Sequence, residues 1–241
     1  MELENVLASG FEALGVTPDA EAASRYRIYF EYLEEMNAVM NLTAISGETD
    51  VARLHFLDSA ALLTLPEFEG GRVIDVGTGA GFPGLALKIA RPELELTLLD
   101  SLDKRINFLR NTCERLGFDD VECIHARAEE APAAYRGAFD TVTSRAVARL
   151  ALLCELCIPL VKKGGAFIAM KGPDCGEEVR EAKRGIAMLG GRLERVADYT
   201  VPGTDITHSA VIIRKVNDTL PKYPRRWAQI KKQPLSLGAP A

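Results

Sequence analysis

The chain has 241 residues, of which 47% are hydrophobic and 26% are charged, and its net charge is −5. These values are those of a folded domain with a small extension, and they exclude a disordered chain. The N-terminus has no cationic segment followed by an apolar one, and the most apolar stretch, residues 150–161, is interrupted by Glu155 and Pro159. Five cysteines without framework spacing suit a reducing compartment. We therefore expect a cytoplasmic, monomeric protein with no membrane span.

The charge is distributed unevenly. From residue 214 onwards there are seven basic residues and one acidic residue, a net charge of +6, which leaves −11 for the rest of the chain. The negative total argues against a nucleic-acid partner, but a basic segment of this kind is typical of a contact with a polyanion. It also occurs as an ordinary solvated surface, so both interpretations stay open.

Residues 1–66 predict helices only and form an expected N-terminal helical cap. Thr17-Pro18-Asp19 is typical of a helix start, and the helix should run towards Met40. A second helix is indicated by apolar residues at three- and four-residue spacing, and it should end before Pro66. These residues are Val51, Leu54, Leu57, Ala61 and Leu65.

From residue 72 short apolar runs alternate with amphipathic stretches, as in successive β-α units on a parallel sheet. Strands are predicted at 72–76, 95–100, 121–125, 139–143 and 164–170, with helices at about 82–90, 102–116, 129–135, 147–161 and 175–189. The strands expected at 192–201 and 208–215 are joined by a turn too short for a helical crossover, so this pair should be antiparallel. The pattern predicts a Rossmann-like α/β domain over 67–216 and a basic tail over 217–241.

Residues 73–84, VIDVGTGAGFPG, are the richest segment for function. A buried strand enters a glycine loop, and a helix leaves it with Pro83 near its first turn. Glycines suit this position because the backbone must turn tightly and approach a ligand without obstruction by a Cβ atom. We expect Gly77, Gly79, Gly81 and Phe82 to contact a nucleotide-like cofactor.

The glycine spacing also satisfies the dinucleotide fingerprint, so a nicotinamide-dependent oxidoreductase is a competing interpretation. Asp75 stands two residues before the first glycine. A carboxylate there can accept hydrogen bonds from a cationic amino-acid group, whereas it would repel a pyrophosphate at short range. The register of Asp75 and the glycines is similar to the first motif of class I S-adenosylmethionine-dependent methyltransferases.

Two acidic positions follow the next strands. Asp100 ends the second strand, 19 residues past Gly81, where a carboxylate can accept hydrogen bonds from both ribose hydroxyls of an adenosyl group. It can equally cap the following helix. Ala128-Glu129 follows the third strand, at the place that holds the adenine in class I methyltransferases. Glu129 has the simpler alternative of favouring a helix N-terminus.

Taken together, these segments resemble the RsmG (GidB) family of small-subunit ribosomal RNA guanine-N7 methyltransferases. The resemblance extends from about residue 28 to 235, and its tail motifs match the longer members. It rests on residues 40–45, 55–59, 75–84, 99–105, 144–146 and 171–172, and on 223–226 and 231–235 in the tail.

The resemblance implies a Rossmann-like fold with a seven-stranded, mostly parallel sheet whose last strand is antiparallel. It implies S-adenosylmethionine as cofactor, held by Gly77, Phe82, residues 100–102 (Asp100, Ser101 and Leu102), Ala128-Glu129 and Arg145. It also implies 16S ribosomal RNA as the partner, in the small subunit or an assembly intermediate. Because Phe82 and Ala128 occupy positions of variable size in the family, contact through their backbone is the firmer expectation.

Arg145 and Lys171 are the candidate catalytic residues, since they lie at the carboxyl ends of the fourth and fifth strands. Arg145 is expected to orient the methionyl end of the cofactor or stack on the guanine, and Lys171 to contact a phosphate or the guanine O6. Ordinary surface salt bridges are the alternative for both. His55 and Asp58 share a helical face and more often brace a cap than touch RNA. The expected RNA contacts are Lys171, Arg225, Arg226, Lys231 and Lys232.

The chemistry fits the absence of a nucleophile-base pair. Guanine N7 carries a free lone pair at neutral pH, so the enzyme needs positioning and exclusion of water, not a general base. The sequence lacks the motif expected for methylation of exocyclic amines, has only Cys175 near a place suited to pyrimidine C5 methylation, and shows no evident metal cluster. A non-catalytic RNA-binding assembly factor with a vestigial cofactor pocket is the third interpretation.

Overall fold

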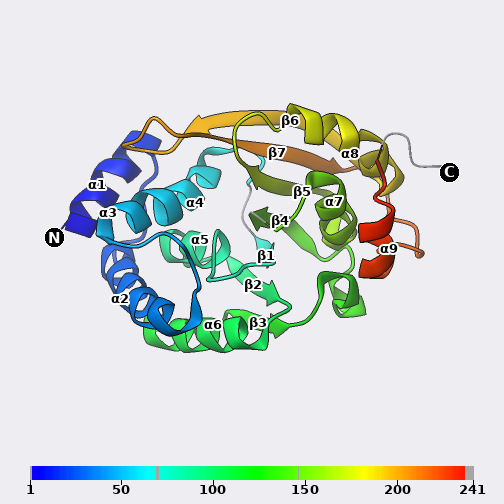
Figure 1. Cartoon of the computed structure of the whole chain (residues 1–241). Coiled ribbons are helices and arrows are strands. Elements are labelled where there is room, and N and C mark those ends of the chain that lie inside the picture. Colours follow the sequence, from blue (N-terminus) through cyan, green and yellow to red (C-terminus); the bar gives the residue numbers. More distant parts are fainter. Residues whose placement is uncertain (1, 69–70, 146, 237–241) are drawn as a thin grey trace.

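The computed structural model describes residues 2–68, 71–145 and 147–236. Its centre is a seven-stranded sheet in the order β3-β2-β1-β4-β5-β7-β6 (Figure 1). The strands are β1 (Arg72–Val76), β2 (Glu95–Asp100), β3 (Glu122–His125), β4 (Phe139–Arg145), β5 (Val161–Lys171), β6 (Gly191–Thr200) and β7 (Thr207–Lys215). The seven-stranded architecture expected from the sequence is confirmed.

The first five strands are parallel, and β7 runs antiparallel to both β5 and β6. β1 to β3 form one half of the sheet, and the chain then returns to place β4 on the other side of β1. This reversal of strand order is the topological switch point, beside whose carboxyl ends doubly wound folds bind their ligands.

Helices cover both faces of the sheet (Figure 1). On one face α5 (Gly84–Ala90) and α6 (Asp103–Leu116) pack with the N-terminal helices in a single apolar core. On the other face α7 (Leu150–Cys157), α8 (Gly176–Met188) and α9 (Trp227–Lys232) contribute to a second core. No helix in the described parts of the chain is long and apolar enough to cross a membrane.

The N-terminal region is helical as predicted, but it has more pieces. It comprises α1 (Glu2–Leu14), α2 (Ala22–Met40) and one continuous helical segment made of α3 (Glu48–Val51), a π-helical stretch η1 (Ala52–Leu57), α4 (Asp58–Ala60) and the 3-10 turn η2 (Ala61–Thr64). Tyr26 and Phe56 from these helices share a buried core with Leu85 and Phe108 of the sheet domain. Because the core is continuous, a domain boundary at residue 66 stays a prediction.

Three predicted helices differ from the structure. The helix expected at Thr17 begins at Ala22, since the Asp19 amide donates to the carbonyl of Ala90 and its carboxylate accepts from the amide of Glu21. The helix expected at 129–135 is two 3-10 turns, Ala128–Glu130 and Ala133–Tyr135, because Pro132 disfavours helical geometry at the residue before it. The helix expected at 147–161 covers only Leu150–Cys157, and β5 already begins at Val161.

Candidate active site

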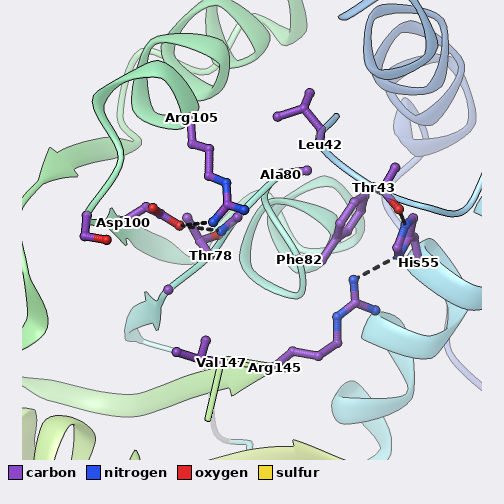
Figure 2. A pocket seen from close by; sticks show the side chains of 13 residues that line it. Leu42, Thr43, His55, Thr78, Ala80, Phe82, Asp100, Arg105, Arg145 and Val147 are labelled. Atoms are coloured by element: carbon purple, nitrogen blue, oxygen red, sulfur yellow. Dashed lines mark hydrogen bonds and ion pairs between the residues drawn. The ribbon is translucent and has the colours of Figure 1, made fainter. Parts of the chain in front are cut away.

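Three adjoining cavities open beyond the carboxyl ends of the strands. The first, of about 350 Å³, lies over the glycine loop (Figure 2). A second, of about 440 Å³, shares His55 and Arg145 with it. A third, of about 120 Å³, shares Gly77, Asp100 and Ser101 with the first. The three cavities therefore form one elongated site at the switch point of the sheet.

The glycine loop has the geometry that the sequence predicts. Gly77, Gly79 and Gly81 all have positive φ, at 70°, 62° and 103°, a region that side chains disfavour. A Cβ atom on Gly77 would lie 2.5 Å from Val147 Cγ2, and one on Gly84 would lie 2.8 Å from Asp75 Cβ. The amide of Gly77 donates to the carbonyl of Leu99 at 2.8 Å, which ties the loop to the end of β2.

Asp75 braces the loop from beneath. Its carboxylate is fully buried and accepts hydrogen bonds from the hydroxyls of Thr78 (2.7 Å) and Thr143 (3.2 Å) and from the amide of Gly84 (2.9 Å). Burial raises its pKa to about 6 against the effect of these hydrogen bonds. Asp75 does not line any of the three cavities described above, so its direct contact with a cofactor stays a prediction.

Asp100 lies where the first and third cavities meet, and its carboxylate accepts hydrogen bonds from two backbone amides. One oxygen accepts from the amide of Gly79 (3.0 Å) and lies 3.4 Å from the Arg105 guanidinium, and the other accepts from the amide of Leu102 (2.9 Å). The carboxylate thus fixes the glycine loop as well as the start of α6. Both sequence-based roles, ligand contact and helix start, are compatible with its position on the cavity wall.

The N-terminal helices take part in the site, which sequence analysis missed. The Tyr29 hydroxyl of α2 donates to the carbonyl of Ala80 in the glycine loop. The Phe82 ring stacks on Tyr29 (centroids 5.4 Å apart) and on His55 (4.2 Å), and the Arg145 guanidinium lies 5.0 Å from its centroid. The glycine loop is therefore clamped between the sheet and the helical cap.

Arg145, at the end of β4, separates the first cavity from the second. It donates to Asp58 Oδ2 (2.9 Å), to the carbonyl of Leu54 (3.1 Å) and to His55 Nδ1 (2.9 Å). Asp58 is buried, and burial opposes its ionisation. The hydrogen bond from His208 and the charge of Arg145 outweigh this and hold the pKa of Asp58 below its ordinary value.

His55 is held as the neutral imidazole. Arginine can only donate, so Nδ1 of His55 accepts from Arg145, and the ring proton must be on Nε2, 2.8 Å from Thr43 Oγ1. Burial, reinforced by the charge of Arg145, lowers the pKa of His55 to about 3. Figure 2 shows this chain of contacts on one side of the cavity, with Asp100 and Arg105 on the other.

The remaining predicted cofactor residues lie at the third cavity or beside it. Ala128 and Glu129 line it together with Ser101, as the sequence suggests for an adenine site. Trp227, from the C-terminal tail, lines the same cavity and was not predicted to do so. Gly81 and Leu102 do not line these three cavities: Gly81 packs under Tyr29, and Leu102 is 43% exposed.

The predicted RNA-binding residues fall into two groups. Lys171 lines the second cavity and pairs with Glu178 (2.8 Å). Arg225 binds the fully buried Glu155 through two side-chain hydrogen bonds and its backbone amide, an arrangement that argues against an RNA contact by this residue. The exposed tail positions are Arg226, Lys231 and Lys232. Residues 237–241 of the predicted tail lie outside the described residues.

The residues present fit an adenosyl cofactor. A side chain at position 77 would collide with Val147, and both residues line the first and third cavities. The Asp100 carboxylate lies between the polar first cavity, over the glycine loop, and the smaller, more apolar third cavity. The fold and this site define a class I S-adenosylmethionine-dependent methyltransferase.

Comparison with known proteins places the chain more narrowly. The family model GidB, rRNA small subunit methyltransferase G, matches residues 22–205. The chain belongs to this family. The ribosomal RNA small subunit methyltransferases G of Clostridium botulinum (strain Loch Maree / Type A3) and Alkaliphilus metalliredigens are each 43% identical over 238 residues, covering 98% of this chain and 100% of those proteins.

A solved structure shares the fold alone. The crystal structure of TrmN from Thermus thermophilus aligns with a TM-score of 0.52 at 20% identity, over 66% of this chain and 48% of that chain.

Proposed function

We propose that this chain transfers the methyl group of S-adenosylmethionine to N7 of a guanine in the 16S ribosomal RNA of the small subunit. Membership of the rRNA small subunit methyltransferase G family supports the substrate. The observation that carries the proposal is the pair of adjoining cavities that share Arg145 and His55, one over the glycine loop and one open beside it. A cofactor and an acceptor base need two such neighbouring spaces.

The reaction requires neither a general base nor a nucleophile from the protein. S-adenosylmethionine, when bound, supplies an electrophilic methyl group. The lone pair of guanine N7 forms the new bond to carbon as the carbon–sulfur bond breaks, which gives N7-methylguanine and S-adenosylhomocysteine without removal of a proton. Among the described residues lining the two larger cavities there is no cysteine, which suits an acceptor that needs no covalent attack by the enzyme.

The protein contributes position and exclusion of water. The glycine loop, which has no Cβ atoms at Gly77 and Gly79, and Asp100 hold the nucleoside end, and Phe82, stacked between His55 and Tyr29, forms a wall of the cavity. Arg145 is held in one orientation by three acceptors. Correct placement of two reactants can contribute about 7–11 kcal/mol to lowering a barrier.

The proposal extends to the partner. We assign the exposed Arg226, Lys231 and Lys232 to the RNA backbone, because basic side chains that are not already paired gain most from phosphate contacts. The substrate is the small subunit or an assembly intermediate, and the protein acts as a monomer in the cytoplasm.

The direct test is methyl transfer in vitro. Small subunits that lack the modification are incubated with the protein and S-adenosylmethionine carrying an isotopically labelled methyl group, and the RNA is digested to nucleosides for mass spectrometry. We expect label in N7-methylguanosine. Calorimetry with both cofactors addresses the oxidoreductase alternative: binding of NAD without binding of S-adenosylmethionine would reverse the assignment.

A further inference from the structure

The second cavity contains chemistry that cofactor binding does not use. Its walls combine apolar side chains with four groups that carry protons, His55, Arg145, Lys171 and His208. Arg145 is occupied by Asp58, Leu54 and His55. His208 and Lys171 line this cavity and not the first, so they are the groups that can address a ligand bound in this space alone. The apolar part of the wall is formed by Ile45, Leu54, Met170 and Ile206.

The position of the proton on His208 follows from its partner. Nδ1 lies 2.8 Å from Asp58 Oδ1, and the ionised carboxylate can only accept, so Nδ1 carries hydrogen. No described residue forms a hydrogen bond with Nε2 of His208, and 28% of the side chain is exposed. The hydrogen bond to Asp58 also raises the pKa of His208, which extends the pH range over which the ring is protonated and carries a second N–H, on Nε2.

Lys171 has one N–H group left to donate to a ligand. Its ammonium group donates to the carbonyl of Ala148 (2.7 Å) and to Glu178 Oε2 (2.8 Å), which uses two of its three hydrogens. The side chain is 11% exposed and lies on the cavity wall at the end of β5. The cavity therefore offers two charge-assisted donors, one from β5 and one from β7.

We propose that the second cavity is the acceptor-base pocket and that His208 and Lys171 donate hydrogen bonds to O6 of the guanine, so that they select guanine over adenine. The inference rests on the proposed function and adds the residues that recognise the base. Guanine presents the O6 acceptor beside N7, whereas adenine presents an amino group at the same place. Two donors facing that amino group would be left unpaired, which costs binding energy.

Asp58 acts as the positioning residue for this pocket. Its Oδ1 accepts from His208 and from the Tyr199 hydroxyl (2.9 Å), and its Oδ2 accepts from Arg145. One buried carboxylate thus orients the imidazole in the base pocket and the guanidinium on the cofactor side. A base bound against His208 lies next to Arg145, the residue common to both cavities.

The test compares two histidine variants that separate the two ring nitrogens. His208→Asn places an amide near the Nδ1 position and keeps a contact with Asp58, but it removes the donor at Nε2. His208→Gln extends to the Nε2 position and keeps that donor. Ser209→Ala is the matched control on the same strand, since the Ser209 hydroxyl donates to Asp198, outside the base pocket.

Each protein is assayed on small subunits that carry either guanine or 2-aminopurine, which keeps N7 but lacks O6, at the mapped target position. Loss of a charge-assisted hydrogen bond corresponds to a reduction in kcat/KM of about 10- to 100-fold. The wild type and Ser209→Ala should show at least this reduction on 2-aminopurine, where both hydrogen bonds to O6 are lost. His208→Asn should already show it on guanine, and its further loss on 2-aminopurine should be smaller than that of the wild type, because only the Lys171 hydrogen bond is left to lose. His208→Gln should recover part of the activity on guanine. The Kd for S-adenosylmethionine should stay within about twofold throughout.

Two results would overturn the inference while leaving the proposed function intact. One is an undiminished penalty for 2-aminopurine in His208→Asn, since the two changes would then act independently. The other is a fall in affinity for S-adenosylmethionine parallel to the fall in kcat/KM, which would make His208 a structural residue only. Failure of the wild type to methylate any small-subunit RNA is a separate outcome, and it would remove the proposed function and the inference with it.

Discussion

Arg145 and Asp58 form an ion pair of 2.9 Å that joins β4 to the helical segment of the N-terminal cap, across 87 residues of sequence. The pair is buried on the Asp58 side and lies between the two larger cavities. It therefore contributes to folding and to the site at once, because the same guanidinium that neutralises Asp58 also fixes His55 and faces Phe82.

Arg145→Ala should destabilise the protein and impair the site together. Removing one partner of a buried ion pair leaves an uncompensated charge, and we expect the free energy of unfolding to fall by about 3 kcal/mol. Denaturant unfolding followed by circular dichroism measures this. Arg145→Lys, which keeps the charge but not the fork of donors, should recover part of the stability. A loss below about 1 kcal/mol for Arg145→Ala would mean that His208 alone compensates Asp58.

His55 should make stability depend on pH in a definite direction. Its pKa in the folded protein, about 3, lies below the ordinary value of 6.5. Between these values the unfolded chain binds a proton that the folded protein does not, so the contribution of His55 is complete above pH 6.5 and is lost as the pH falls. The stability advantage of the wild type over His55→Asn should shrink by about 1.4 kcal/mol per pH unit below 6.5.

Unfolding of both proteins at pH 7, 6 and 5 provides the measurement. Carboxylates that titrate in this range, including Asp75, are present in both proteins, so their effects cancel in the difference. A constant difference across the three pH values would show that the pKa of His55 is the same in the folded and the unfolded protein.

Gly77→Ala should impair cofactor binding far more than its backbone strain predicts. The new Cβ would lie 2.5 Å from Val147 on the wall of the cavities. Gly117→Ala is the control, because Gly117 has a similar φ of 72° at the end of α6 and no atom within 4 Å of the added Cβ. Both should lose about 1–2 kcal/mol of stability from strain. Calorimetry should show weaker binding of S-adenosylmethionine for Gly77→Ala alone, and equal affinities would place the cofactor elsewhere.

The basic tail should separate into structural and RNA-binding parts. Arg225→Ala should lower the free energy of unfolding by about 3–5 kcal/mol, since it strands the buried Glu155. The double variant Lys231→Ala, Lys232→Ala should leave stability unchanged, weaken RNA binding and reduce its salt dependence. Titrations of small-subunit RNA at several salt concentrations test this, and an unchanged salt slope would exclude these two lysines from the phosphate contacts.

The sequence was most informative where chemistry and local geometry coincide. The loop needs glycines because its backbone takes up positive φ values, and the alternation of strands and helices indicates a parallel sheet. The fold and the glycine loop could therefore be predicted from the local sequence pattern. The short turn before β7 likewise identified the antiparallel pair.

Long-range contacts were not accessible in this way. Nothing near Tyr29 or Trp227 indicates that they reach the glycine loop and the third cavity, since each does so from an element far away in the chain. The tail charges illustrate the same limit: Arg225 and Lys231 look equivalent in sequence, and only the buried Glu155 on α7 distinguishes them. His208 is isolated in the sequence, and the role proposed for it depends on its contact with Asp58, 150 residues earlier.

The most direct measurement is nucleoside mass spectrometry of small-subunit ribosomal RNA from cells with and without this chain. Our account predicts that one N7-methylguanosine disappears when the chain is removed, and that it returns with the wild-type gene but not with Gly77→Arg, which blocks the loop. An unchanged set of methylated nucleosides in its absence, or full restoration by Gly77→Arg, would contradict the assignment of this site to methyl transfer.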